Sequence, residues 1–351
     1  MDIPAFKIAF IPLLTKSNFL SMMLRKFMKT LFIQDKYLKN SQSPSPGVGN
    51  DKNRGNHENS LGIVFVLASA IVWSFGGALK HFISTGESWT IVFWRSIWAA
   101  LFLLVFMLVR EGRRGTLTLF ARMGLPGICV GICFATASTS FIIALVHTTV
   151  ANILLMQAGV PLIAALIIWI LFRERVSLPT WIAIAFVIMG VAVMVSDSFT
   201  GKVSPMGDAL SLLIAFSFAC ATVITRRYAH VRMVPAVCLG TVISACVSGV
   251  LASTFVVTLP DMGILIVFGS LNLGVGLAFF VTGVRIIPSA LAALLGTVET
   301  VLGPIWMWLI HNEIPTIRTL IGGLLVLTAL LCHISWSIYR QKSAIVNKTP
   351  I

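Results

Sequence analysis

The chain has 351 residues, of which 57% are hydrophobic and 11% are charged, whereas an ordinary soluble domain has about 25% charged residues. This composition excludes a soluble protein. A formal net charge of +14 would suggest nucleic acid as a partner of a soluble chain, but here the basic residues are sparse and separated by apolar runs, so we predict no nucleic-acid partner. The chain has about 200 apolar residues and a membrane span takes about 20, so composition predicts an integral membrane protein with about ten spans.

Residues 1–60 differ from the rest of the chain. Basic and apolar side chains alternate through the first thirty residues, which is typical of an amphipathic segment on an anionic membrane surface or of a targeting segment. A later true start is a third interpretation, because methionines also stand at Met22, Met23 and Met28. Residues 40–60 are rich in Ser, Pro, Gly and Asn. We therefore expect residues 1–60 to be a basic, largely disordered tail and linker.

From Leu61 onward, long apolar runs alternate with short polar breaks. Each run is long enough to cross about 30 Å of hydrocarbon at about 1.5 Å per residue. The runs predict ten spans, at residues 61–83, 88–109, 120–142, 148–171, 178–196, 207–228, 234–257, 260–282, 289–311 and 315–338. The expected fold class is therefore an all-α membrane protein.

The distribution of Lys and Arg predicts the orientation of the spans. Of the 26 basic residues, 22 fall in the amino-terminal tail, in the even-numbered connections or in the tail 339–351. The odd-numbered connections hold only Lys80, Lys202 and Arg318, and Arg95 lies within the second span. Because basic residues concentrate on the cytoplasmic side of a membrane, we expect both termini to be cytoplasmic, with the protein in the cell (inner or plasma) membrane.

The two halves of the chain resemble each other. At an offset of 139 residues, equivalent positions include Ala151 and Ala290, Pro161 and Thr300, Glu174 and Glu313, and Ala183 and Gly322. Five-span units repeated in tandem, here residues 61–196 and 207–338, must enter the membrane from opposite sides. Inverted repeats of this kind are typical of transporters, in which two halves enclose a central site. We therefore expect ten helices arranged as two inverted five-helix repeats.

On these features the chain resembles the drug/metabolite transporter superfamily, specifically its EamA-type exporters. The resemblance covers about residues 61–340 and includes Trp73, Gly76 and Lys80 in the first span and Arg95 in the second. The family usually has Glu-Pro in both repeats, whereas here the copies read Val160-Pro161 and Glu299-Thr300, so each copy keeps one half of the pair. The resemblance implies export of small metabolites, amino acids or drugs through an alternating-access cavity.

Glu299 is the acidic side chain that we place at bilayer depth, about 15 Å from either end of the ninth span. An ionisable group at that depth costs at least ~2.5–3.5 kcal/mol and is a functional candidate by default. It could carry a proton or balance the charge of a cationic substrate. The alternative is a protonated glutamate that forms hydrogen bonds across helices, beside Thr297 and Thr300.

Arg95 lies about 10 Å inside the external end of the second span, between Trp94 and Trp98. It could bind a substrate carboxylate, or it could pair with Glu299, whose depth differs by about 5 Å. The alternative is that its side chain reaches the external headgroups within a belt of tryptophans.

Three uncharged residues complete the candidate substrate site: Trp73, Gln157 and Asn272. Amides in apolar helices could bind a ligand or form interhelical hydrogen bonds, and Trp73 could stack on an amphipathic substrate or pack in the core. Gln157 is close to Pro161, and interrupted helices are where transporters place binding sites. The six cysteines all lie within apolar runs, and the closely spaced pair Cys129 and Cys133 has no His or carboxylate nearby, so we predict no metal site, and we expect no cofactor.

The pattern favours a secondary transporter, and not an enzyme, with a small-molecule substrate and the lipid bilayer as its partners. Proton coupling through Glu299 is the accompanying hypothesis. One rival is an intramembrane enzyme, but the sequence lacks His-Glu-x-x-His and Gly-x-x-x-x-Gly-Lys motifs. The other is a non-transporting scaffold or receptor, which the repeats and Glu299 count against.

Overall fold

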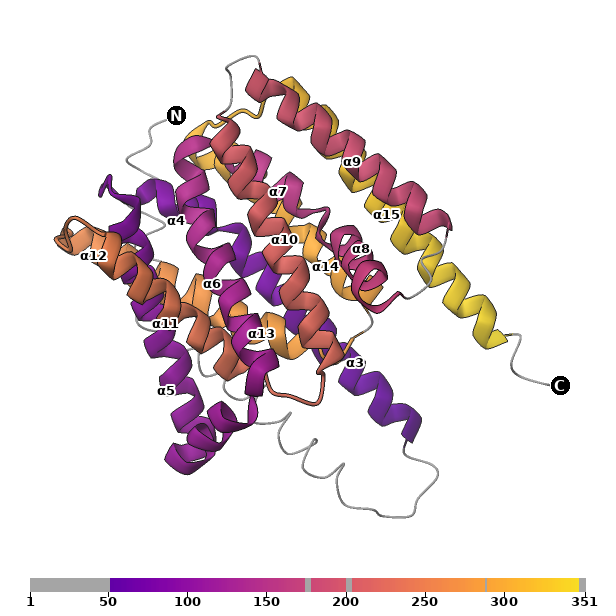
Figure 1. Cartoon of the computed structure of the whole chain (residues 1–351), viewed down its shortest axis with the longest axis horizontal. Coiled ribbons are helices and arrows are strands. Elements are labelled where there is room, and N and C mark those ends of the chain that lie inside the picture. Colours follow the sequence, from indigo (N-terminus) through magenta and orange to yellow (C-terminus); the bar gives the residue numbers. More distant parts are fainter. Residues whose placement is uncertain (1–50, 174–177, 200–203, 288, 347–351) are drawn as a thin grey trace. The chain divides into compact units, whose positions relative to one another are not determined.

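The computed structural model describes the backbone of residues 51–173, 178–199, 204–287 and 289–346. The expected amino-terminal tail up to residue 50 and the repeat position Glu174 lie outside these described residues. From His57 onward the chain forms one compact unit, and every element described in it is helical (Figure 1). An all-helical membrane protein is therefore confirmed for the part of the chain that the structure describes.

The helices follow the expected runs closely. Their bounds are α3 (Asp51–Ser74), α4 (Gly76–Phe82), α5 (Ser88–Arg122), α6 (Gly124–His147), α7 (Val150–Gln157), α8 (Val160–Phe172), α9 (Leu178–Phe199), α10 (Pro205–Arg227), α11 (Val234–Leu251), α12 (Leu259–Val267), the π-helix η1 (Phe268–Val275), α13 (Gly276–Gly283), α14 (Ser289–His311) and α15 (Ile317–Val346). Within the described residues, eight helical stretches are long and apolar enough to cross a membrane, and the pair α7–α8, bent by 41°, is a ninth if it is one span. Helix α14 occupies the position of the ninth expected span.

Local sequence explains several helix starts. The side chains of Thr149, Ser204 and Thr258 each accept a hydrogen bond from a backbone N–H in the first turn of the following helix, which satisfies a donor that has no partner within the helix. Prolines stand in the first turn of α8, α10, α11 and α12, where the missing N–H costs no helical hydrogen bond. Pro161 therefore lies in the first turn of α8, which begins at Val160, and does not kink the middle of a continuous helix.

Several boundaries differ from the sequence prediction; α6, for example, ends at His147 instead of 142, and α15 continues to Val346, eight residues past the expected end of its span. Helix α3 begins at Asp51, so residues 51–60, expected to be linker, have a helical backbone. Helix α5 continues to Arg122, past the expected span end, because a bend at Gly112 redirects it. The φ of Gly112 is 69°, a value that glycine adopts without steric cost. Helix α11 ends at Leu251, six residues before the expected end of its span.

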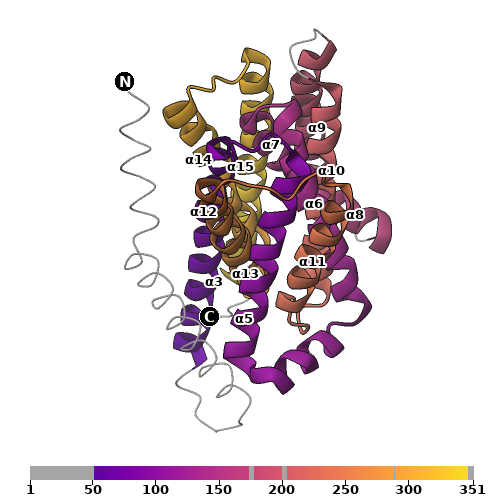
Figure 2. The ribbon, with the colours of Figure 1, turned by 90° about the vertical axis from the view of Figure 1, so that its left-hand side faces the viewer.

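The helices pack in pairs that are distant in sequence. Helix α6 lies against α10 and α11, α5 against α11 and η1, and α9 against α15 along one edge of the bundle (Figures 1 and 2). Helices α6 and α11 approach closely at Gly131 and Gly240: a Cβ at Gly131 would lie 2.8 Å from the carbonyl oxygen of Ala236. Small residues permit this approach of two backbones.

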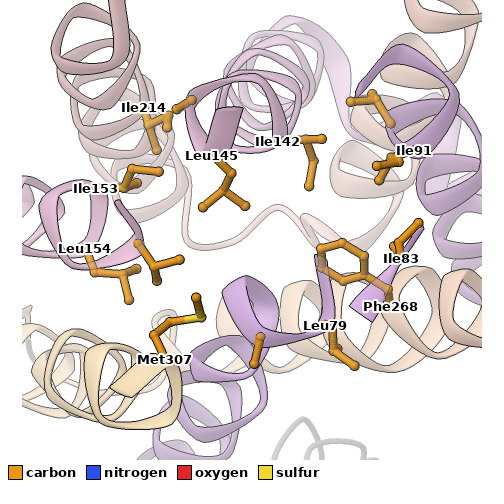
Figure 3. Close-up of a cluster of buried hydrophobic side chains, with 14 of the residues drawn as sticks. Leu79, Ile83, Ile91, Ile142, Leu145, Ile153, Leu154, Ile214, Phe268 and Met307 are labelled. Carbon is orange, nitrogen blue, oxygen red and sulfur yellow. The ribbon is translucent and has the colours of Figure 1, made fainter. Parts of the chain in front are cut away.

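One end of the bundle is filled by apolar side chains, and we call it the sealed end. There α4 ends, α5 begins and α6 ends, and the side chains include Leu79, Ile83, Ile91, Ile142, Leu145, Ile153, Leu154, Ile214, Phe268 and Met307 (Figure 3). Ile142, Ile153 and Phe268 are fully buried. Packing at the density of a protein interior closes this end to solvent.

Candidate binding cavity

A cavity of about 540 Å³ lies inside the bundle, between segments that are far apart in the sequence. All five residues that the sequence singles out line it: Trp73, Arg95, Gln157, Asn272 and Glu299. Helices α3 to α8, α10, η1, α13, α14 and α15 contribute to the walls. The volume is within the range of about 300–1,000 Å³ that is usual for sites of small organic molecules.

The cavity reaches the end of the bundle opposite the sealed end, and we call it the basic end. Arg226 and Arg227, in the last turn of α10, line the cavity, and Arg227 is exposed. At the inner limit of the cavity, Leu154 and Ile214 belong both to its lining and to the apolar cluster of the sealed end. The cavity is therefore open toward the basic end and closed at the other.

Arg95 is 5% exposed and is directed into the bundle. Its Nη1 donates to the carbonyl oxygen and to the Oγ of Ser138 at 3.3 and 3.1 Å, and the guanidinium lies over the ring of Phe268 at 4.4 Å from the centroid. Its Nε is buried without a hydrogen-bond partner. Among the described residues no carboxylate forms an ion pair with Arg95, so Arg95 and Glu299 are not paired in this conformation.

Glu299 belongs to a stripe of α14 that faces the cavity. Ala292, Gly296, Glu299 and Thr300 all line it, at spacings that share one helix face. No described residue donates a hydrogen bond to the Glu299 carboxyl or pairs with it. Helix α14 packs on α7, α4 and α15, whereas α5 with Arg95 packs on α11, η1 and α6. The two ionisable groups therefore come from different walls of the cavity.

Gln157 is the last residue of α7, directly before the 41° bend into α8. Its Nε2 is buried and has no hydrogen-bond partner in the part of the chain that the structure describes. A buried donor without a partner costs free energy, so this amide is available to a bound molecule. The sequence analysis singled out Gln157 because it is close to Pro161, and the structure has a helix break between these two residues.

Asn272 and Trp73 also have structural roles. The Nδ2 of Asn272, in the π-helix η1, donates to the carbonyl of Val72, so the amide forms the interhelical hydrogen bond that was the alternative interpretation. The Trp73 ring contacts the rings of Phe218 and Phe280, with centroids 5.6 and 5.2 Å apart. Both residues nevertheless line the cavity, so packing and ligand contact are compatible at these positions.

Sequence reasoning missed several cavity residues. Phe134, Phe218 and Phe280 pack with Trp73 into an aromatic group in the cavity wall, but nothing distinguishes them from the other phenylalanines in the sequence. His333 on α15 lines the cavity, and its Nδ1 is buried without a hydrogen-bond partner among the described residues. The rule that draws attention to ionisable residues within spans applies to His333 as well and would have found it.

A polar contact lies outside the spans at the sealed end. The Oε1 of Glu313, in the turn between α14 and α15, accepts a hydrogen bond from the backbone N–H of Val150 at 3.0 Å, and its Oε2 lies 3.9 Å from the Nε2 of His81. The carboxylate therefore caps α7. Burial raises the pKa of Glu313, and the nearby His81 and Lys80 oppose that shift.

Comparisons with known proteins agree with this architecture. The EamA-like transporter family matches the chain twice, over residues 60–196 and 205–335. The pseudopaline exporter CntI of Pseudomonas aeruginosa (strain UCBPP-PA14) is 24% identical over 277 residues, which cover 77% of this chain and 94% of that protein. A solved crystal structure of an unnamed protein is 18% identical, with a TM-score of 0.57 over 78% of this chain and 96% of that one. The last likeness concerns the fold alone.

Proposed function

Because the chain belongs to the EamA-like transporter family, we propose that it is a secondary transporter that exports a small organic metabolite, amino acid or drug by alternating access. The observation that carries the proposal is the cavity, which is open at one end of the bundle and closed at the other. Transport requires a site that is reached from one side of the membrane at a time. A membrane scaffold that binds no small molecule has no need of such a cavity.

The proposed topology has ten spans in two inverted repeats, residues 61–196 and 207–338, with the tails 1–60 and 339–351 in the cytoplasm and the protein in the plasma membrane. The sorting of 22 of the 26 basic residues to one side supports it. In this frame the basic end is cytoplasmic. An exporter binds its substrate from that side, and the cavity is open there.

The proposal includes coupling to protons through Glu299. Its carboxyl lines the cavity without a partner among the described residues, so it could exchange a proton when the cavity opens to either side. An ionisable group within a span that faces a cavity is where proton relays are found in transporters.

Counterflow in proteoliposomes tests the transport proposal. The first solutes are pseudopaline, which the name of the bacterial relative gives as its substrate, and a panel of amino acids and cationic drugs. We expect saturable exchange of at least one solute, chemically unchanged. Failure of every solute to show saturable exchange, with the protein correctly inserted, would refute the proposal.

Glu299→Gln tests the coupling. We expect this variant to insert normally but to lose the dependence of flux on an imposed pH gradient. Glu111→Gln is the matched control, because Glu111 pairs with Arg110 and Arg232 away from the cavity. A Glu299→Gln variant with the pH dependence of the wild type would exclude coupling through this residue.

A further inference from the structure

We infer that the ligand of the cavity is a small amino-dicarboxylate, in which a protonated amine is flanked by two carboxylates, with the amine at Glu299 and the carboxylates at Arg95 and Arg226. The inference rests on the proposed function, in that it assigns a substrate class to the proposed transport site. It is carried by three charged side chains that line the cavity and have no charged partner in the described part of the protein.

When Glu299 is ionised, Arg95, Arg226 and Glu299 together have a net charge of +1. Arg95 is buried, and among the described residues its hydrogen bonds are to Ser138 alone. Arg226 is half-buried, and Glu299 and Arg226 have no hydrogen bond or ion pair with any described residue. Arg227 also lines the cavity, but it is exposed and has an interaction of its own, so it is left out of this charge balance. A ligand of net charge −1 therefore neutralises the cavity.

Their order along the cavity fixes the order of charges in the ligand. Arg226 is in the last turn of α10, at the open end. Glu299 is ten residues from the start of α14, about 15 Å inside that end. Arg95 is seven residues from the start of α5 at the opposite end, about 10 Å in from there. The protein thus presents positive, negative and positive charge in sequence, and the complementary ligand is anionic, cationic and anionic.

Simpler ligands leave one of these charges without a partner. A cation alone would satisfy Glu299 but neither arginine, and a simple amino acid would satisfy Arg95 and Glu299 but not Arg226. A charge held in a site of low dielectric without a partner is costly, so occupancy favours the ligand that pairs all three. Charge-assisted hydrogen bonds from a guanidinium to a carboxylate also give orientation.

The remaining walls suit the carbon skeleton of such a molecule. Trp73, Phe134, Phe218 and Phe280 form an apolar wall beside the charged groups. The partnerless Nε2 of Gln157 and Nδ1 of His333 add hydrogen-bonding capacity without adding an acid. A cavity of about 540 Å³ has room for a flexible dicarboxylate.

Calorimetric titration of the purified full-length protein in detergent tests the charge pattern. The probe is N-(4-carboxybutyl)glycine, which has an amine between two carboxylates and a net charge of −1 at neutral pH. The comparison ligands are its N-acetyl derivative, which has no positive charge, and its two monoamides, each lacking one carboxylate. We expect the probe to bind and each derivative to bind at least ~10-fold more weakly, because each loses one charge-assisted contact.

Variants assign each contact to a residue. In Glu299→Gln the N-acetyl derivative should bind with the same affinity as the probe, because the partner of the amine is gone. In Arg95→Met one of the two monoamides should bind with the same affinity as the probe. In Arg226→Met the other monoamide should do so. Arg232→Met and Glu111→Gln are the matched controls, because their ion pair lies away from the cavity, and both should discriminate as the wild type does. Arg95→Lys retains the charge if Arg95→Met fails to fold.

Two outcomes would overturn the inference. One is equal binding of the probe and its three derivatives, and the other is wild-type discrimination in all three cavity variants. A simple amino acid that binds as tightly as the probe would also contradict the role of Arg226. Calorimetry measures binding without transport, so the two proposals can fail separately. If the probe binds more tightly than its derivatives but the protein shows no flux, only the proposed function is refuted. If the protein shows saturable flux of solutes that lack a carboxylate, only this inference is refuted.

Discussion

The two ends of the helix bundle differ in how the same helices pack. At the sealed end, α4, α6, α7 and α14 contribute apolar side chains to one buried cluster, with Ile142 and Ile153 fully buried. At the basic end, the later turns of α7–α8, α10 and α15 leave a cavity between them. In a transport cycle the sealed end would open while the basic end closes, so we expect the contacts of the sealed end to break and form again in each cycle.

Breaks in the helices lie between the two ends. Helix α3 gives way to α4 at Phe75, α7 gives way to α8 at Ala158–Gly159, and the π-helix η1 separates α12 from α13. Breaks of this kind free backbone groups and permit bending. Trp73, Gln157 and Asn272 all lie at or beside one of these breaks, so the cavity residues occupy the level at which the two halves of each span can move separately.

Filling the open end should have the largest effect. Gly296 lines the cavity, and a Cβ built there meets no atom within 4 Å, so Gly296→Trp should fit without a clash while occupying the site. We expect flux in proteoliposomes to fall to background. Gly263 on α12 also has free space around a Cβ but lies away from the cavity, so Gly263→Trp should transport normally. Equal loss of flux in both variants would mean that the cavity is not the pathway.

Truncating the sealed end should have a smaller and different effect. Ile142→Ala removes a fully buried side chain of α6 and should lower the free energy of unfolding by about 2–4 kcal/mol, because it leaves a cavity in a close-packed cluster. Ile132 on the same helix is 50% exposed, so Ile132→Ala should change stability by less than ~1 kcal/mol. Thermal denaturation in detergent measures both. A similar loss in the two variants would contradict the assignment of this cluster as the tightly packed end.

The fold was predictable from the sequence to the level of its helices, because hydropathy and charge record how each segment meets the membrane. The positions of Glu299 and Arg95 were predictable for the same reason, since an ionisable residue within an apolar run is conspicuous. The position of Glu299 relative to Arg95 around the cavity was not predictable, because the depth of a residue along its helix does not tell which wall of the bundle that helix forms. The bend at Gly112 depends on local backbone geometry that the apolar pattern does not encode, whereas Pro161 drew attention to the break after Gln157.

The aromatic wall shows the same limit on sequence reasoning. Phe134, Phe218 and Phe280 come from three helices, and each is one phenylalanine among 23. Only the packing of those helices brings the rings together beside Trp73. A residue type that is common in every span identifies no site by itself, whereas a rare charge does.

The polar contact at the sealed end should give the smallest effect, seen as a pH dependence of stability. Burial raises the pKa of Glu313 above its ordinary value of 4.5, so the folded protein holds this proton more tightly than the unfolded chain does. Its contribution to stability is therefore fully present below pH 4.5 and is lost as the pH rises through the raised pKa. Glu313→Gln keeps an oxygen that can accept from the N–H of Val150, so we expect it to remove this pH dependence while preserving the cap.

Glu87 provides the control of opposite sign. Hydrogen bonds from Ser253, Thr90 and Thr254 lower its pKa, so its contribution is present at neutral pH and is lost as the pH falls, and Glu87→Gln should flatten the acid limb of the profile instead. Melting temperatures of the wild type and both variants between pH 4 and 8 measure the two effects. If Glu313→Gln retained the wild-type slope above pH 4.5, the buried carboxylate would not be what makes the sealed end pH-sensitive. If Glu313→Ala, which removes the acceptor, were as stable as Glu313→Gln, the cap on α7 would contribute nothing to holding that end closed, because loss of an N-terminal cap normally costs about 1 kcal/mol.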